Sequence, residues 1–424
     1  MTTEAGSNIV GAVAPHRTGF ANYLFAHAAW FLAFGVQMVL FPYLVRVILQ
    51  ENAVRFGLAQ MCLQLPTTLL ILLGGFVADR TDTKRTIVIA NLLNVGMFGV
   101  LGVLVISGHL TYELLIGYAL VMGVIGAFAM PARDALLSQV APEATGIQRA
   151  VALTTMAQFA GQILGMILAV MAPLIGVGPL FIGQGVLMGV AALVASRLTP
   201  RPRQEVHARG DDHPITFLTN QIREGFSAAM GSAIIAPVVI CAVGMGLFFM
   251  GAFAVLLPLI VQGYFPESGG DKTKIASALG AFSLCFWIGS MISASILIRF
   301  GALKHKGIIY LCALALGGMV LVACSIHVPM WVLFVFNFVW GLGGGVAMTL
   351  GRGLIQGHAP AEKRARILSI FTLGTMGGAP LGAPIYGFLA HNMDPHQVVL
   401  FPGIGMLALV VLVAAFSKLR HVGD

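Results

Sequence analysis

The chain alternates between long runs without charged side chains and short polar segments. No Asp, Glu, Lys or Arg occurs in residues 56–78, 86–106, 225–266 or 307–351. About 20 helical residues cross the roughly 30 Å hydrocarbon layer of a bilayer, and only helices or closed barrels satisfy their backbone polar groups there. Because these runs are longer and more continuously apolar than barrel strands, the pattern predicts membrane-spanning helices.

The apolar runs predict twelve spans joined by loops. They cover residues 20–45, 56–78, 86–106, 112–132, 150–172, 179–196, 233–262, 275–298, 307–326, 330–350, 367–390 and 398–416. Residues 327–329, His-Val-Pro, form the expected turn in a run that is long enough for two helices. The predicted fold class is an all-α polytopic membrane protein, with twelve transmembrane helices in two pseudo-symmetric six-helix bundles.

One longer polar segment divides the spans six and six. RPRQEVHARGDDHP is followed by ITFLTNQIREGFSAAM, which predicts a short surface helix. The expected parts are a cytoplasmic N-terminal tail (1–19), an N-terminal bundle (20–199), a cytoplasmic linker (200–232), a C-terminal bundle (233–417) and a cytoplasmic C-terminal tail (418–424). Residues 1–19 lack the apolar core of a secretory signal, so the first span is expected to stay in the mature protein.

The composition agrees with a protein that lies in a bilayer. Charged residues make up 9% of the chain and hydrophobic ones 58%, whereas soluble domains carry about 25% charged residues. The net charge of +8 comes from short basic clusters between apolar runs, which argues against nucleic acid as a partner. The five cysteines lie inside apolar runs without a CxxC pair, so free thiols are expected, with no metal site and no cofactor.

The distribution of basic residues predicts the orientation. If both termini are cytoplasmic, all but four of the 24 lysines and arginines lie on the cytoplasmic side. The four exceptions are Arg46, Arg55, Lys272 and Lys274. Such a bias is typical of inner-membrane proteins with cytoplasmic basic loops. We therefore expect a multi-pass protein of the inner (plasma) membrane with both termini in the cytoplasm.

The two halves resemble each other at a nearly constant offset along the chain. Ala129-Met130 corresponds to Ala347-Met348, and GQILG at 161–165 corresponds to GAPLG at 378–382. Two such bundles facing each other form a known transporter plan, with the substrate site at their interface. Gly161, Gly165, Gly378 and Gly382 have the spacing of helix-packing glycines. The alternative, that small residues recur in every membrane helix, stays open.

The segment GGFVADRTDTKR, residues 74–85, lies in the predicted loop between spans two and three. It resembles the signature loop of the major facilitator superfamily in Gly75, Asp79, Arg80, Lys84 and Arg85, although Thr83 stands where many members carry a base. Asp82 is typical of a bacterial efflux branch similar to the enterobactin exporter. MPARDALL, IREGF and APAEKRARILSIF extend this resemblance over essentially the whole chain.

The resemblance implies a secondary active transporter that works by alternating access and exports a small amphipathic or apolar solute. Uptake by the same fold and a non-transporting sensor or scaffold are the alternatives. An enzyme is not expected, because no Walker loop, HExxH or GxSxG motif occurs. The antiporter arginine of span four would align near Ala119, so the usual group for proton coupling is missing. The expected partners are a small-molecule solute, the bilayer and a coupling proton, although the usual coupling arginine is missing. The chain is expected to be a monomer.

The signature loop predicts a gate between the bundles. Asp79 at the end of span two is expected to lie against the positive N-terminal end of span eleven and nearby arginines. The gate candidates are Gly75, Asp79, Arg80, Asp82, Lys84 and Arg85, with Arg133, Arg364 and Arg366 as partners. The alternative is a solvated loop that only sets the topology.

Polar side chains inside the spans predict the solute cavity. The candidates are His27, Gln37, Gln64, Gln158, Gln162, Asn337, Trp340 and Tyr386. An equally weighted alternative is that such side chains tie helices together, at about 0.6 kcal/mol each. His27 is the one titratable group well inside an early span. It is either a proton carrier or a packing histidine.

Overall fold

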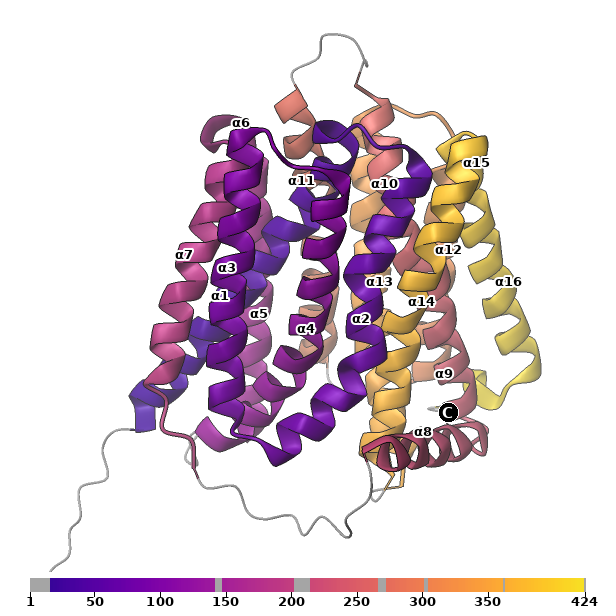
Figure 1. The fold of residues 1–424 in the computed structure, drawn as a ribbon. Coiled ribbons are helices and arrows are strands. Elements are labelled where there is room, and N and C mark those ends of the chain that lie inside the picture. The colour runs from indigo at the N-terminus through magenta and orange to yellow at the C-terminus, as the bar shows by residue number, and fades with distance from the viewer. Residues whose placement is uncertain are drawn as a thin grey trace, which may run out of the picture.

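The computed structural model describes residues 16–141, 147–201, 214–265, 272–300, 304–360 and 363–422. Within these residues twelve helices are long and apolar enough to cross a membrane. Figure 1 shows them as a bundle of roughly parallel rods with one helix, α8, lying across one end. The predicted fold class is confirmed.

Six spans form the N-terminal bundle. They are α1 (His16–Tyr43) with a π-helical extension (Leu44–Ile48), α2 (Ala53–Arg80), α3 (Thr83–Ser107), α4 (Tyr112–Val140), α5 (Ile147–Val170) and α7 (Val177–Ser196). A short helix, α6 (Ala172–Ile175), joins the last two. The linker helix α8 spans Pro214–Met230, within the segment where a surface helix is predicted.

The C-terminal bundle holds the other six spans. The first consists of α9 (Ile235–Gly244), a π-helical segment (Met245–Met250) and α10 (Gly251–Gly263). The others are α11 (Lys272–Phe300), α12 (Lys306–Ala323), α13 (Met330–His358), α14 (Arg364–Asn392) and α16 (Leu400–Phe416), the last preceded by α15 (Pro395–Val398). A 3₁₀ turn at Lys418–His421 follows.

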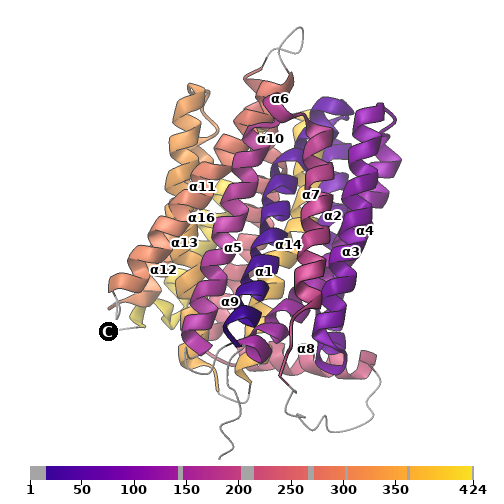
Figure 2. The ribbon, with the colours of Figure 1, turned by 90° about the vertical axis from the view of Figure 1, so that its left-hand side faces the viewer.

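Two faces of the molecule are distinguished by the chain ends. Helix α1 begins, α16 ends and α8 lies at one face, which we call the terminal face (Figure 1 and Figure 2). The opposite face, which we call the distal face, carries α6 and α15. The tail and linker residues 1–15, 202–213 and 423–424, for which cytoplasmic positions are expected, lie outside the described residues.

The same helix pairing occurs in both bundles. In the N-terminal bundle α1 packs on α5, α2 on α4 and α3 on α7. In the C-terminal bundle the first span packs on α14, α11 on α13 and α12 on α16. Helices α4 and α13 have 29 residues each and begin at Tyr112 and Met330. These two starting points have the same separation as Ala129 and Ala347, so the offset found in the sequence relates equivalent helices.

Glycines allow the backbones within each bundle to approach closely. A Cβ at Gly161 or Gly165 of α5 would overlap the backbone of α1 at Ala28 or Leu32. In the C-terminal bundle, Gly378 and Gly382 of α14 lie in the same way against the backbone of the first span, at residues 246–251. Since lipid tails are as apolar as the side chains, close packing of this kind is what holds membrane helices together.

The helices extend farther than the apolar runs. Span four is predicted to end at residue 132, but α4 continues to Val140. Arg133 and Asp134 therefore belong to a membrane-spanning helix, and the prediction that Arg133 lies in a loop is wrong. The predicted span ends at its first charged residue. A charged side chain that hydrogen-bonds to neighbouring helices, as Arg133 does, need not end a helix.

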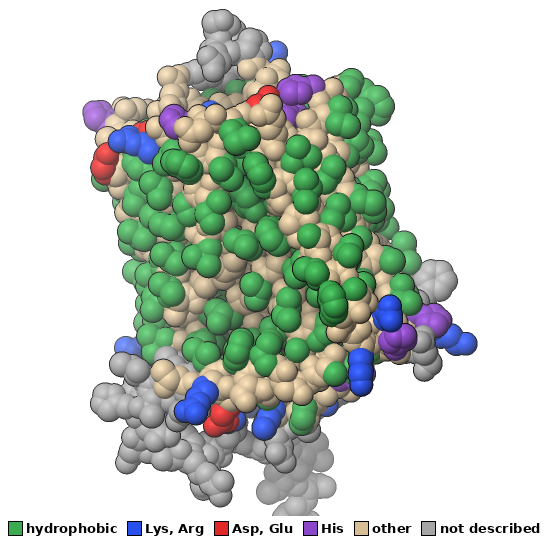
Figure 3. Space-filling view, turned by 90° about the vertical axis from the view of Figure 1, so that its right-hand side faces the viewer, with side chains coloured by type: hydrophobic (Ala, Val, Ile, Leu, Met, Phe, Trp, Pro, Cys, Tyr) green, Lys and Arg blue, Asp and Glu red, His purple; other side chains and the backbone are tan. Residues whose placement is uncertain are grey.

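The outer surface has the distribution of side chains that a bilayer requires. In Figure 3 hydrophobic side chains cover the wall of the molecule, and charged ones gather at its two ends. Among the described residues, large apolar side chains that are exposed include Leu69, Val186, Leu381 and Val411. The exposed apolar belt is the lipid-facing surface.

Adjacent glycines of α2 give a stability prediction. A Cβ at Gly74 would overlap the backbone of α4 at Ala127, whereas one at Gly75 would meet no atom within 4 Å. Gly74→Ala should destabilise the protein by about 1–3 kcal/mol, the range for overpacking. Gly75→Ala is the matched control and should unfold at the wild-type temperature. Thermal unfolding in detergent measures both, and equal loss in the two variants would contradict the packing.

Candidate functional site

Hydrogen bonds between described residues join the two bundles near the distal face. Gln60 donates to the carbonyl of Ala254 at 3.0 Å, and Ser277 donates to the carbonyl of Val170 at 2.6 Å. Arg46 Nε donates to Gln262 Oε1 at 3.0 Å. All of these bonds lie in the distal half of their helices, so this half of the interface is closed.

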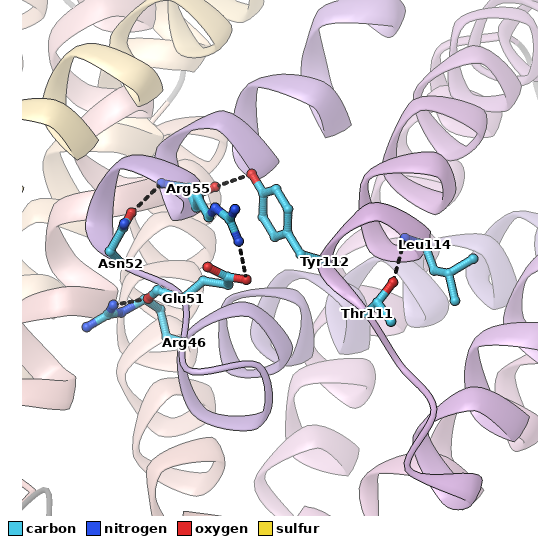
Figure 4. Close-up of polar contacts among 7 residues, drawn as sticks. All are labelled: Arg46, Glu51, Asn52, Arg55, Thr111, Tyr112 and Leu114. Atoms are coloured by element: carbon cyan, nitrogen blue, oxygen red, sulfur yellow. Dashed lines mark hydrogen bonds and ion pairs between the residues drawn. The ribbon is translucent and has the colours of Figure 1, made fainter.

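Arg46 is the base that joins the bundles at the distal face. Its guanidinium also donates to the carbonyl of Glu51, and the Glu51 carboxylate pairs with Arg55 at 2.9 Å. Asn52 caps α2, and the Tyr112 hydroxyl donates to the carbonyl of Arg55 at 2.8 Å. Figure 4 shows these groups at the turn from α1 to α2, close to the start of α4. The cluster fixes the position from which Arg46 reaches the other bundle.

Close backbone contacts reinforce this distal closure. A Cβ at Gly57 of α2 would overlap the carbonyl of Ala383 of α14, and one at Gly387 would overlap that of Ala53. Gly280 of α11 lies against Val170 of α5. Helices α2 and α14, and α5 and α11, therefore meet across the interface from the distal face inward.

Aromatic rings meet at mid-depth between the bundles. Phe159 of α5 and Trp287 of α11 lie with their ring centroids 6.2 Å apart. On the C-terminal side Phe286 contacts both Trp287 and Trp340, at 5.7 and 5.4 Å. The buried indole nitrogen of Trp287 has no hydrogen-bond partner among the described residues. The middle of the interface is therefore aromatic and offers one free N–H donor.

Two opposite charges face each other in the terminal half. Asp134 of α4 and Arg352 of α13 are both exposed and interact electrostatically. Each lies six residues before the end of its helix, Val140 or His358, which is roughly 9 Å along the axis. Asp134 and Arg352 are as far apart along the chain as the first residues of α4 and α13. They therefore occupy equivalent positions on opposite sides of the interface.

The signature loop contains one capping residue and several exposed charges. Asp82 caps α3, accepting hydrogen bonds from the amides of Lys84 and Arg85 at 2.9 and 3.3 Å. Asp79, Arg80 and Arg85 are exposed, and Arg80 stacks over the ring of Phe76 at 3.7 Å. The geometry thus assigns Asp82 a local role that the signature pattern does not reveal.

The start of α14 contacts the linker helix. Arg366 pairs with Glu224 of α8, and Gly225 lies against the backbone of Arg366 and the side chain of Ile370. Arg364 is exposed. Glu224 is absent from the sequence-based candidates, although its segment IREGF is quoted for the family resemblance. The printed sequence gives no sign that this acid meets a base 142 residues farther along the chain.

Arg133 is buried inside the N-terminal bundle. Its side chain donates to the carbonyl of Ala26 at 3.1 Å and to Asn91 Oδ1 at 2.9 Å. Its guanidinium lies over the Trp30 ring at 4.2 Å. It therefore ties α4 to α1 and α3. Its predicted role as a gate partner stays a prediction.

The cavity candidates divide by exposure. Six are more than nine-tenths buried: His27, Gln37, Gln162, Asn337, Trp340 and Tyr386. Asn337 donates to the carbonyl of Phe282 at 2.6 Å, joining α13 to α11. Gln64 and Gln158 keep intermediate exposure. In this conformation most of the candidates are therefore packed between helices, and only Gln64 and Gln158 of the eight are partly exposed. The role of the set in solute binding stays a prediction.

His27 lies in the same buried region as Arg133. Its ring is tilted against those of Tyr23 and Phe31, and neither ring nitrogen has a hydrogen-bond partner among the described residues. Protonation would add a second buried positive charge near the guanidinium, which is unfavourable. This geometry favours the packing histidine over the proton carrier.

The described residues offer no candidate for metal chemistry. Nowhere in the described part of the chain do three or more His, Cys, Asp and Glu side chains form a group that could hold a metal ion. The groups that line the interface are amides, aromatic rings and a pair of opposite charges. Such groups can bind an organic solute and respond to bundle movement.

Comparison with known proteins identifies one family and several relatives. The family model described as "Transmembrane secretion effector" matches residues 10–424. The staphyloferrin A transporter of Staphylococcus aureus is 24% identical over 370 residues, which is 85% of this chain and 87% of that protein. The 4-hydroxybenzoate transporter PcaK of Acinetobacter baylyi is 27% identical over 165 residues, which is 39% of this chain and only 34% of PcaK.

Solved structures share the fold. The nucleoside transporter NupG superposes with a TM-score of 0.71 at 13% identity, covering 94% of this chain and 98% of NupG. A bacterial homologue of the human lysosomal transporter Spinster, in an inward-facing and occupied conformation, gives a TM-score of 0.64 at 13% identity, covering 97% of each chain. At these identities the likeness concerns the fold alone.

Asp82 gives a prediction that separates capping from charge. Asp82→Ala removes the cap and should cost about 1 kcal/mol, whereas Asp82→Asn keeps an acceptor and should cost a few tenths. Hydrogen exchange of the first turn of α3 measures the local effect. Equal protection in Asp82→Ala and wild type would contradict the capping role. Faster exchange in Asp82→Asn, matching the alanine variant, would assign the effect to charge.

Proposed function

Because the chain belongs to the transmembrane secretion effector family of the major facilitator superfamily, we propose that it is a secondary active transporter that moves a small organic solute by alternating access. The two bundles are the moving bodies, and the interface between them holds the solute. The structure represents the state that is closed at the distal face.

One observation carries the proposal. Hydrogen bonds join the bundles in the distal half, whereas the terminal half presents Asp134 and Arg352, exposed and facing each other. A rocking motion that opens the distal face brings these charges together, and they then form the ion pair that closes the terminal half. Because Asp134 and Arg352 occupy equivalent positions in the two repeats, the two bundles contribute equally to the movement that brings them together.

We further propose that the terminal face is cytoplasmic and that transport runs outward. The bias of lysine and arginine toward the terminal side supports the orientation. The family description supports export. On this proposal the solute enters from the cytoplasm, and its binding precedes closure of the terminal half.

The solute we propose is aromatic or amphipathic. Phe159 and Trp287 offer ring faces from opposite bundles, and Trp287 offers a free N–H donor. In this structure the two rings contact each other, so a planar solute would pack against them only after the bundles move apart. Each aromatic pair it then forms would contribute about 0.5–1.5 kcal/mol beyond area burial. The name of the relative PcaK, a 4-hydroxybenzoate transporter, supports this solute class.

Flux through purified protein tests the proposal. The protein is sealed into liposomes, and uptake and release of radiolabelled 4-hydroxybenzoate are followed with and without an imposed proton gradient. A saturable flux above that of protein-free liposomes is expected, and Trp287→Leu should reduce it more than Val186→Ala, a change at an exposed apolar side chain of α7. If Trp287→Leu left the flux of the probe unchanged, the aromatic site would be contradicted. If the protein transported no aromatic acid at all, the proposed solute class would be contradicted.

The facing charges give a swap prediction. Asp134→Arg or Arg352→Asp alone places like charges opposite each other and should reduce flux at least about tenfold, equivalent to about 1.4 kcal/mol of barrier. The double variant restores opposite charges and should regain most of the flux. Lys418→Asp, an exposed change in the terminal turn, is the control. Full flux in both single variants would contradict a closing ion pair.

A further inference from the structure

A second polar site lies inside the N-terminal bundle, away from the bundle interface. A small cavity between α1, α3, α4 and α7 is lined by His27 and Arg133 together with Ala26, Ile87, Leu136 and Leu198. Leu198 follows the end of α7, and Ile87 lies in the first turns of α3. The cavity is therefore close to the terminal face.

Two buried polar side chains face this cavity without satisfying each other. Arg133 is 3% exposed and His27 is 4% exposed. Arg133 Nε and both ring nitrogens of His27 have no hydrogen-bond partner among the described residues. Since buried donors are almost always paired, two such side chains on one cavity indicate a ligand that accepts hydrogen bonds.

The charge balance restricts the ligand further. The two terminal nitrogens of Arg133 reach neutral oxygens, of Ala26 and Asn91, and the described residues form no ion pair with it. Asp134 interacts with it electrostatically but is itself exposed. A buried charge without a counter-charge is strongly unfavourable, so an anion is a better occupant than a neutral molecule.

The size of the cavity limits the anion to a small one. Its volume is about 10 Å³, about the room that one water-sized particle needs. Tyr23 also lines the cavity, but its hydroxyl donates to the carbonyl of Arg133. The remaining walls are apolar and offer nothing to the further oxygens of a phosphate or carboxylate. We propose that the cavity binds a single halide ion, with chloride as the natural occupant, held by Arg133 Nε–H and by one N–H of neutral His27.

The site would act as a clamp on the N-terminal bundle. Arg133 already joins α4 to α1 and α3 through Ala26, Asn91 and Trp30. A bound anion neutralises the guanidinium and adds His27 of α1 to the same network. The site is distinct from the aromatic contacts between the bundles, and its existence does not depend on the identity of the transported solute.

Halide-dependent stability tests the site. Thermal unfolding of the full-length protein is measured in detergent with sodium chloride or bromide, and with sodium gluconate at equal ionic strength. At a halide concentration ten times the dissociation constant, the unfolding equilibrium should shift about elevenfold toward the folded state. The rise in Tm should saturate with halide and be absent in gluconate.

Variants locate the effect. Arg133→Gln removes the charge, and the halide-dependent shift in Tm should disappear whatever the stability of the variant itself. If Arg133→Gln does not fold, His27→Phe removes the second donor and should weaken the shift. Arg197→Gln, at an exposed arginine near the same face, is the matched control and should keep the full shift. Bromide should give an anomalous peak beside Arg133 Nε in crystals.

Three results would overturn the proposal. Equal Tm values in chloride and gluconate show that no halide binds. A shift that persists in both cavity variants places the ion elsewhere. A crystallographic peak beside Arg133 without anomalous signal in bromide assigns the cavity to water. None of these results bears on solute flux, so failure here is distinguishable from failure of the transport proposal.

Discussion

The structure depends on close backbone contact between helices in a medium that gives no hydrophobic reason for them to associate. Lipid tails solvate apolar side chains as well as neighbouring helices do, so small residues and short contacts decide which helices stay together. Gly74, Gly161 and Gly165 supply these contacts in one bundle, and Gly378 and Gly382 supply them in the other. Each bundle is thereby a rigid body.

The interface between the bundles is built differently. Its distal half has close glycine contacts at Gly57 and Gly280 and several hydrogen bonds. Its middle is aromatic, and its terminal half carries opposite charges at equivalent positions of the repeat. A closed distal half and a terminal half with facing, exposed charges suit two rigid bodies that rock about a central site. The linker helix, held to α14 by Glu224 and Arg366, stays with the C-terminal bundle.

The fold was predictable because hydrophobicity over the length of a span is a property of the chain itself. The number of spans and their repeat offset follow from apolar runs and do not require knowledge of side-chain partners. The site was less predictable for the opposite reason. The sequence places Arg133 outside span four, because the groups that its guanidinium contacts, Trp30, Ala26 and Asn91, are distant along the chain. No local pattern reveals them.

The polar residues inside the spans show the same limit. Asn337 and Gln37 satisfy the criteria for cavity residues in the sequence, but both are almost fully buried in this conformation. Whether an amide faces a cavity or a neighbouring helix depends on helix rotation, which polarity alone does not fix. The charges Asp134 and Arg352 are absent from the predicted cavity, because the predicted spans 112–132 and 330–350 end before them.

Rocking of the two bundles is tested most directly by distances at both ends of the same pair of helices. Spin labels at Ser138 and Gln356 report the terminal ends of α4 and α13, and labels at Glu113 and Trp331 report their distal ends; all four positions are exposed. Measured by double electron–electron resonance in liposomes, the two distances should change in opposite directions when the proton gradient or an aromatic acid is applied. If neither the terminal distance nor the distal distance changed under any condition, the account would be contradicted.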